Sequence, residues 1–72
     1  MTNIKISVFT PTFNREKTLV DVFRSLMAQT FKLFEWIIID DGSTDGTENL
    51  VKSFVENSNF EIKYYKQENR GK

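Results

Sequence analysis

The sequence predicts an α/β domain of the Rossmann-like type, in which strands and helices alternate as β-α-β-α-β around a parallel three-stranded sheet. Three apolar segments with strand-like patterns alternate with two segments whose apolar residues recur every three or four positions. The connections between the strands are long enough to hold helices, and helical crossovers of this length require parallel strands with right-handed connections. In such sheets ligands bind beyond the carboxyl ends of the strands, so functional residues are expected there.

The first strand and the first helix lie on either side of the only proline. We expect a strand at residues 4–10, where apolar and polar side chains alternate. Pro11 is expected to end it, because proline removes a donor of the hydrogen-bond ladder. After a loop at 12–14, residues 16–29 are expected to form a helix. Its apolar face comprises Leu19, Val22, Phe23, Leu26 and Met27.

The second strand and helix are joined by an acidic loop. Consecutive apolar residues within 35–40 predict a strand that is covered on both faces, as in a parallel sheet. Residues 41–45 follow as a loop, and a helix is expected from residue 44 or 45 to 56. Its apolar stripe comprises Leu50, Val51, Phe54 and Val55. Alternation over 60–66 predicts the third strand, and residues 67–72 read as a polar tail.

Length and composition exclude several classes of protein. With 72 residues the chain is one small domain or a piece of one. The absence of Cys and His excludes disulfides, thiolate or imidazole metal sites and catalysis by either side chain within these residues. The net charge is zero, so no nucleic-acid partner is expected. Without a long apolar run or a signal peptide, the chain is expected to be cytoplasmic.

Two adjacent carboxylates, Asp40 and Asp41, follow the second strand. They repel each other unless a ligand, a metal or hydrogen-bond donors separate them, so the pair is expected to have a function. Asp45 and Glu48 match a capping box and are expected only to cap the helix. An EF-hand is excluded, because Lys52 stands where the loop needs a bidentate glutamate.

The loop after the first strand carries no glycine-rich phosphate motif. Phe13 would either act as a hydrophobic side chain that packs on this loop or stack on a nucleotide base. Arg15 would be either a solvated charge at the helix start or a phosphate contact. Because the acidic loop repels phosphates, a nucleotide would present its base or ribose to the carboxylates.

Four segments together resemble one enzyme family. They are SVFTPTFNR (residues 7–15), LMAQTF (26–31), EWIIIDDGSTDGT (35–47) and ENRGK (68–72). In this order and spacing the chain resembles glycosyltransferase family 2, the inverting transferases of GT-A fold that use nucleotide-diphosphate sugars. The resemblance covers nearly the whole chain.

The resemblance implies a role for residues of both loops. Pro11, Thr12 and Phe13 would line the base site, where the family often has Tyr in place of Phe13. Asp41 would accept a hydrogen bond from the ring N–H of the base, and Asp40 would shape the loop.

Further implied features concern the phosphates and the reaction. Arg15 would reach the diphosphate, and Gly71 and Lys72 belong to a motif that passes the ribose and phosphates. The family's metal-binding DxD motif and catalytic base lie further on, so no catalytic or metal-binding residue is expected here. A divalent metal, Mg²⁺ or Mn²⁺, is expected in the full-length enzyme, with ligands mostly outside this chain. Residues 1–72 would then be an incomplete domain, the N-terminal nucleotide-binding piece of a GT-A glycosyltransferase.

The same resemblance implies a donor of UDP or GDP type and a glycan or lipid-linked acceptor. A cytoplasmic location, or the cytoplasmic face of a membrane in the full-length protein, would follow. The edge of the first strand is expected to lie open in this chain and to promote self-association. Two other classes stay open. One is a non-catalytic flavodoxin-like signalling module whose Asp40 and Asp41 form an acidic pocket, and the other is a plain assembly module.

Overall fold

The computed structural model describes residues 6–30 and 33–68 and confirms the predicted order of elements. They are β1 (Ile6–Thr12), α1 (Glu16–Met27), β2 (Phe34–Asp40), α2 (Thr47–Asn57) and β3 (Glu61–Lys66). All strand pairs are parallel, and β2 lies between β1 and β3. Neither of these two helices is long and apolar enough to cross a membrane.

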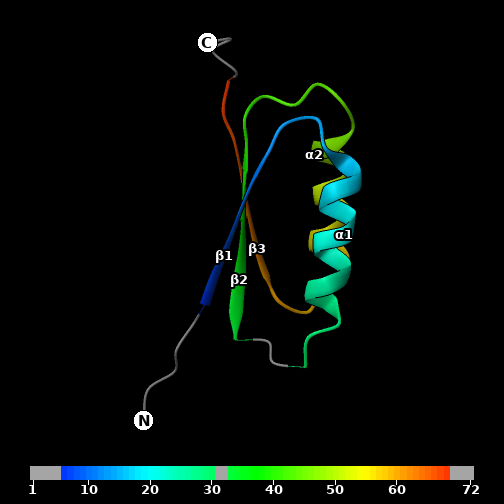
Figure 1. Cartoon of the computed structure of the whole chain (residues 1–72), viewed down its shortest axis with the longest axis vertical. Coiled ribbons are helices and arrows are strands. Elements are labelled where there is room, and N and C mark those ends of the chain that lie inside the picture. Colours follow the sequence, from blue (N-terminus) through cyan, green and yellow to red (C-terminus); the bar gives the residue numbers. More distant parts are fainter. Residues whose placement is uncertain (1–5, 31–32, 69–72) are drawn as a thin grey trace.

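Both helices cover the same face of the sheet (Figure 1). The strand order follows the chain order, so two crossovers of the same hand must place both helices on one side. The expectation that β2 is covered on both faces is therefore wrong for this part of the chain. Its alternate residues Glu35, Ile37 and Ile39 are only half-buried, whereas Trp36 and Ile38 face the helices and are fully buried.

The core lies between the sheet and the two helices. The Phe23 ring of α1 stacks on the Phe54 ring of α2, with 4.2 Å between their centroids, and both rings contact Trp36. The buried core side chains are Leu19, Leu26, Phe34, Trp36, Ile38, Val51 and Phe54. The predicted stripes are thus largely confirmed, except that Val55 is 51% exposed because α2 buries positions 47, 51 and 54 instead.

The strand β1 does not end at Pro11. It continues to Thr12, and Pro11 pairs in register with Ile39. The backbone of Thr12 faces β2, since its carbonyl accepts a hydrogen bond from Asp41 N–H at 2.9 Å. Neighbouring residues of a strand direct their backbone groups to opposite sides, so Pro11 faces the outer edge, where its missing donor costs nothing. Residues 4 and 5 of the expected strand lie outside the described residues.

Candidate functional site

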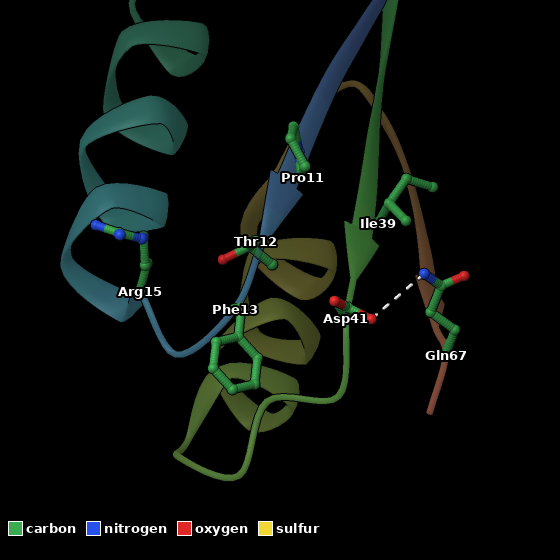
Figure 2. Close-up of a pocket in the computed structure, with 7 residues that line it drawn as sticks. All are labelled: Pro11, Thr12, Phe13, Arg15, Ile39, Asp41 and Gln67. Atoms are coloured by element: carbon green, nitrogen blue, oxygen red, sulfur yellow. Dashed lines mark hydrogen bonds between the residues drawn. The ribbon is translucent and has the colours of Figure 1, made fainter. Parts of the chain in front are cut away.

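A pocket of about 370 Å³ lies at the carboxyl ends of the strands (Figure 2). It is lined by Pro11, Thr12, Phe13, Arg15, Ile39, Asp41 and Gln67. Every site residue predicted from the sequence lines this pocket, except Lys72, which lies outside the described residues. Sequence reasoning missed Ile39 and Gln67, because the first was assigned to the sheet and the second to the polar tail.

The two adjacent carboxylates are divided between the two faces of the sheet. Asp40 is the last residue of β2 and is fully buried under the helices, whereas Asp41 is exposed at the pocket. The alternation of side chains along a strand explains the division. A joint acidic pocket, as the flavodoxin-like alternative requires, is therefore not formed by this pair.

Asp40 anchors the loop that follows it. Its Oδ1 accepts a hydrogen bond from Ser43 N–H at 2.9 Å, and its Oδ2 accepts one from the Tyr64 hydroxyl at 2.5 Å. Burial raises the pKa of Asp40, but the hydrogen bonds from Ser43 and Tyr64 and the charge of Lys66 outweigh it, so the pKa lies below its ordinary value. Burial and the neighbouring Asp40 carboxylate raise the pKa of Tyr64. Protein donors thus hold Asp40 ionised and fix the start of the loop.

Asn14 ties the two loops of the site together, a role that sequence reasoning missed. Its side-chain Oδ1 accepts hydrogen bonds from Thr44 N–H at 2.8 Å and Asp45 N–H at 3.2 Å. Its own N–H donates to Ser43 Oγ at 2.8 Å. Asn14 adopts the left-handed conformation, with φ of 51°. Asparagine tolerates that region better than most residues, which was the one available signal in the sequence.

The helix α2 begins later than expected and without the predicted capping box. Its first residue is Thr47, whose N–H donates to Asp45 Oδ1 at 3.0 Å. In a capping box Glu48 would bond back to Asp45 N–H, but that donor already serves Asn14. Glu48 instead pairs with Lys66 across 3.3 Å. Asp45 therefore supports the helix start, while the interpretation of Glu48 as its capping partner is wrong.

The two charged side chains of the pocket, Arg15 and Asp41, lie on opposite sides of it, and Phe13 lies between them (Figure 2). Phe13 is 43% exposed on the loop after β1, so part of its side chain is accessible. Arg15 immediately precedes α1, and its guanidinium lies on the α1 side of the pocket, away from Asp41 and Gln67 (Figure 2). A flat ligand between Phe13 and Asp41 would meet an apolar surface and a hydrogen-bond acceptor at once.

Thr12 closes the inner end of the pocket. It is almost fully buried, and its Oγ1 has no hydrogen-bond partner within residues 6–30 and 33–68. Figure 2 shows this hydroxyl directed toward the α1 side rather than toward Asp41. A buried hydroxyl without a partner is costly, so a group that bonds to it would be favoured at this strand end.

A divalent metal does not fit the described part of the site. No group of three or more Asp, Glu, His or Cys residues in this part could hold a metal ion. Asp40 is already satisfied by Ser43 and Tyr64, which leaves Asp41 as the carboxylate of the pocket. We therefore assign no step to a metal held by these residues.

Comparison with known proteins identifies relatives over nearly the whole chain. The model of the family "Glycosyl transferase family 2" matches residues 7–72. An uncharacterized glycosyltransferase of Rickettsia conorii is 38% identical over 71 residues, which are 99% of this chain and 11% of the relative. Glycosyltransferase GlyA of Streptococcus pneumoniae is 39% identical over 93% of this chain and 10% of its own length.

A third relative carries a more specific name. GalNAc(5)-diNAcBac-PP-undecaprenol beta-1,3-glucosyltransferase of Campylobacter jejuni is 38% identical over 90% of this chain and 21% of the relative. The chain thus spans about a tenth of the first two relatives and about a fifth of the third. No solved structure matches the chain.

Proposed function

Because this chain belongs to glycosyltransferase family 2, we propose that it binds the donor of a transferase that moves a sugar from a nucleotide diphosphate to an acceptor hydroxyl. Residues 1–72 are then the N-terminal nucleotide-binding piece of a GT-A domain. The small share of each relative that this chain spans supports the proposal, since those relatives contain much further chain.

The observation that carries the proposal is the placement of Asp41 and Phe13 in one pocket. The Phe13 ring offers a surface on which a base can stack, an interaction worth roughly 1–3 kcal/mol. The exposed Asp41 carboxylate accepts a hydrogen bond from a ring N–H of that base. Pro11 and Thr12 form the wall at the end of β1, as the family resemblance implies.

The diphosphate would lie toward the cationic side of the site. Arg15 is the described cation that lines the pocket, and Lys72 would contribute from beyond the described residues. A donor of UDP or GDP type satisfies Asp41, because uracil and guanine carry a ring N–H. A divalent Mg²⁺ or Mn²⁺ belongs to the full-length enzyme, with ligands mostly outside this chain.

The acceptor and the location are inferred from the relatives. The Campylobacter jejuni relative is named for an undecaprenol-linked glycan. We infer a glycan or lipid-linked acceptor of the cell envelope for this protein too, and hence action in the cytoplasm or at the cytoplasmic face of a membrane. Incorporation of labelled sugar into extracted lipid-linked and free glycans would distinguish the two acceptor types.

The outer edge of β1 supports the proposed self-association. Among the described strands β1 pairs on one side with β2, and Ser7 and Phe9 direct their backbone groups to the other side. Open edges of this kind recruit further strands, although Pro11 blunts the carboxyl end of this one. Sedimentation of the 72-residue chain should show concentration-dependent association, and a clean monomer at high concentration would contradict it.

Calorimetric titration of the full-length protein with nucleoside diphosphates tests the donor site. Asp41→Asn removes a charge-assisted hydrogen bond worth about 1.5–3 kcal/mol, so affinity should fall roughly ten- to a hundredfold. Asp45→Asn is the matched control, because Asp45 bonds to Thr47 at the start of α2 and does not line the pocket at the carboxyl ends of the strands. If Asp45→Asn loses binding while Asp41→Asn keeps it, the donor site is assigned to the wrong carboxylate.

A further inference from the structure

Ser43 lies in the acidic loop between β2 and α2 and is almost fully buried, with 6% of its surface exposed. Serine is mostly exposed in proteins, and a loop residue has little reason to be an exception. A buried hydroxyl without hydrogen-bond partners is costly, so the burial of Ser43 requires partners inside the fold. The structure supplies such partners on two sides of this residue.

One side of Ser43 faces the end of β2. Its N–H donates to Asp40 Oδ1 at 2.9 Å, and its side chain hydrogen-bonds to the same carboxylate. An ionised carboxylate can only accept, so the Ser43 hydroxyl gives its proton to this bond. Asp40 also accepts from the hydroxyl of Tyr64 on β3 at 2.5 Å. Ser43 is therefore fixed, through one carboxylate, to the two strands β2 and β3.

The other side of Ser43 faces the loop that follows β1. With its proton directed to Asp40, Ser43 Oγ accepts from Asn14 N–H at 2.8 Å. This bond is partly buried, whereas the bonds from Thr44 and Asp45 to Asn14 Oδ1 are exposed. A hydrogen bond is stronger where water is excluded, so Ser43 provides the firmest of the three connections. The two loops lie at the same end of the sheet, where this contact joins them (Figure 1).

The two residues that would hold the base lie next to this contact along the chain. Phe13 directly precedes Asn14, and Asp41 is separated from Ser43 by Gly42 alone. We propose that Ser43 is a positioning residue for donor binding, whose hydroxyl sets the separation of Phe13 from Asp41. The inference rests on the proposed donor-binding function and adds to it a buried residue that does not line the pocket and acts through the two loops.

Calorimetric titration of the full-length protein with UDP and GDP compares the wild type with Ser43→Ala. The variant keeps the backbone bond to Asp40 but removes the acceptor of Asn14 N–H. The affinity for whichever nucleotide the wild type binds should fall about two- to tenfold, the range for one neutral hydrogen bond. Phe34→Leu is the control for lost stability, because Phe34 is a core residue at the amino end of β2, opposite to the pocket. It should keep the wild-type affinity at a temperature where all three proteins are folded.

Hydrogen exchange distinguishes a positioning role from the loss of one local contact. The N–H groups of Thr44 and Asp45 keep their acceptor, Asn14 Oδ1, when Ser43 is replaced by alanine. If Ser43 sets the separation of the loops, these two amides should nevertheless exchange about two- to tenfold faster in the free Ser43→Ala protein. A saturating nucleotide should restore most of their protection, and Phe34→Leu should leave their exchange unchanged.

The outcomes keep this inference distinct from the donor site itself. Unchanged affinity in Ser43→Ala would overturn the role of Ser43, and so would faster exchange that Phe34→Leu reproduces. Weaker binding without faster exchange would also overturn it, because Ser43 would then act on the ligand rather than on the loops. In each of these cases a loss of affinity in Asp41→Asn would still support the proposed function. If the wild type binds neither nucleotide, both proposals fail.

Discussion

Replacement of Asn14 tests whether one side chain holds the two loops of the site together. We compare Asn14→Ala with Asn14→Gly, because both remove the Oδ1 acceptor that binds Thr44 N–H and Asp45 N–H. The two variants differ in how they tolerate the left-handed backbone at this position, where φ is 51°. Glycine adopts that conformation freely, and alanine does not.

The expected loss of stability is the sum of the lost hydrogen bonds and the cost of the left-handed backbone. Each of the two lost hydrogen bonds is exposed, so each should contribute about 0.5–1 kcal/mol to the free energy of unfolding. Asn14→Gly should therefore destabilise the protein by about 1–2 kcal/mol. Asn14→Ala carries in addition about 1–2 kcal/mol for the left-handed conformation, which gives a total of about 2–4 kcal/mol.

The assay combines urea denaturation of the full-length protein with nucleotide titration. Both variants should weaken nucleotide binding as well, because Phe13 and Asp41 lie on the two loops that Asn14 joins. Asn49→Ala serves as the control, since Asn49 is exposed on α2 and is not a partner in these two hydrogen bonds. Stability of Asn14→Ala equal to or above that of Asn14→Gly would refute the argument from backbone conformation.

Three further predictions concern the buried end of β2 and the acidic loop. Tyr64→Phe should destabilise the protein by about 1.5–3 kcal/mol in equilibrium denaturation, because Asp40 stays charged but loses a donor. The pKa of Asp40 in the folded protein lies below its ordinary value near 3.9. The contribution of Asp40 to stability is therefore complete above about pH 4 and is lost as the pH falls through the folded pKa. Asp40→Asn should flatten this loss when the melting temperature is measured against pH at the acid end. Gly42→Ala should lower the free energy of unfolding by about 1–2 kcal/mol, because Gly42 has φ of 82°, which alanine adopts poorly. Gly46→Ala should change it by no more than about 0.5 kcal/mol, because Gly46 has φ of −83° and the added Cβ needs to displace only the end of the flexible Glu16 side chain. Thermal melting of both variants measures the difference.

The location of the candidate site was predictable because it depends on chain order alone. Once two helical crossovers make the strands parallel, all three carboxyl ends meet at one edge of the sheet. Phe13 and Asp41 immediately follow two of those ends, so their meeting in one pocket needed no knowledge of packing. Pro11 was placed correctly in the site, although its effect on the strand was not, since an edge position removes the penalty of its missing donor.

The residues that complete the site could not be found in the same way. Gln67 appeared in the sequence as part of a polar tail, and only the ladder bond from its N–H to Asp40 O brings it beside Asp41. The role of Asn14 depends on partners thirty and thirty-one residues away along the chain. No local pattern encodes such contacts, because they exist only after the loops are brought together.

The sequence by itself determined the alternation of strands and helices, their apolar faces and the edge of the sheet that carries the pocket. These features follow from local periodicity and chain topology, which hold before any tertiary contact forms. Only the tertiary structure decided that both helices cover one face, and which donors hold the buried Asp40, whose role in shaping the loop the family resemblance had implied. Those outcomes depend on the register of the strands and on which hydrogen-bond donors, such as Ser43 and Tyr64, lie within reach of the buried Asp40 carboxylate in the folded chain.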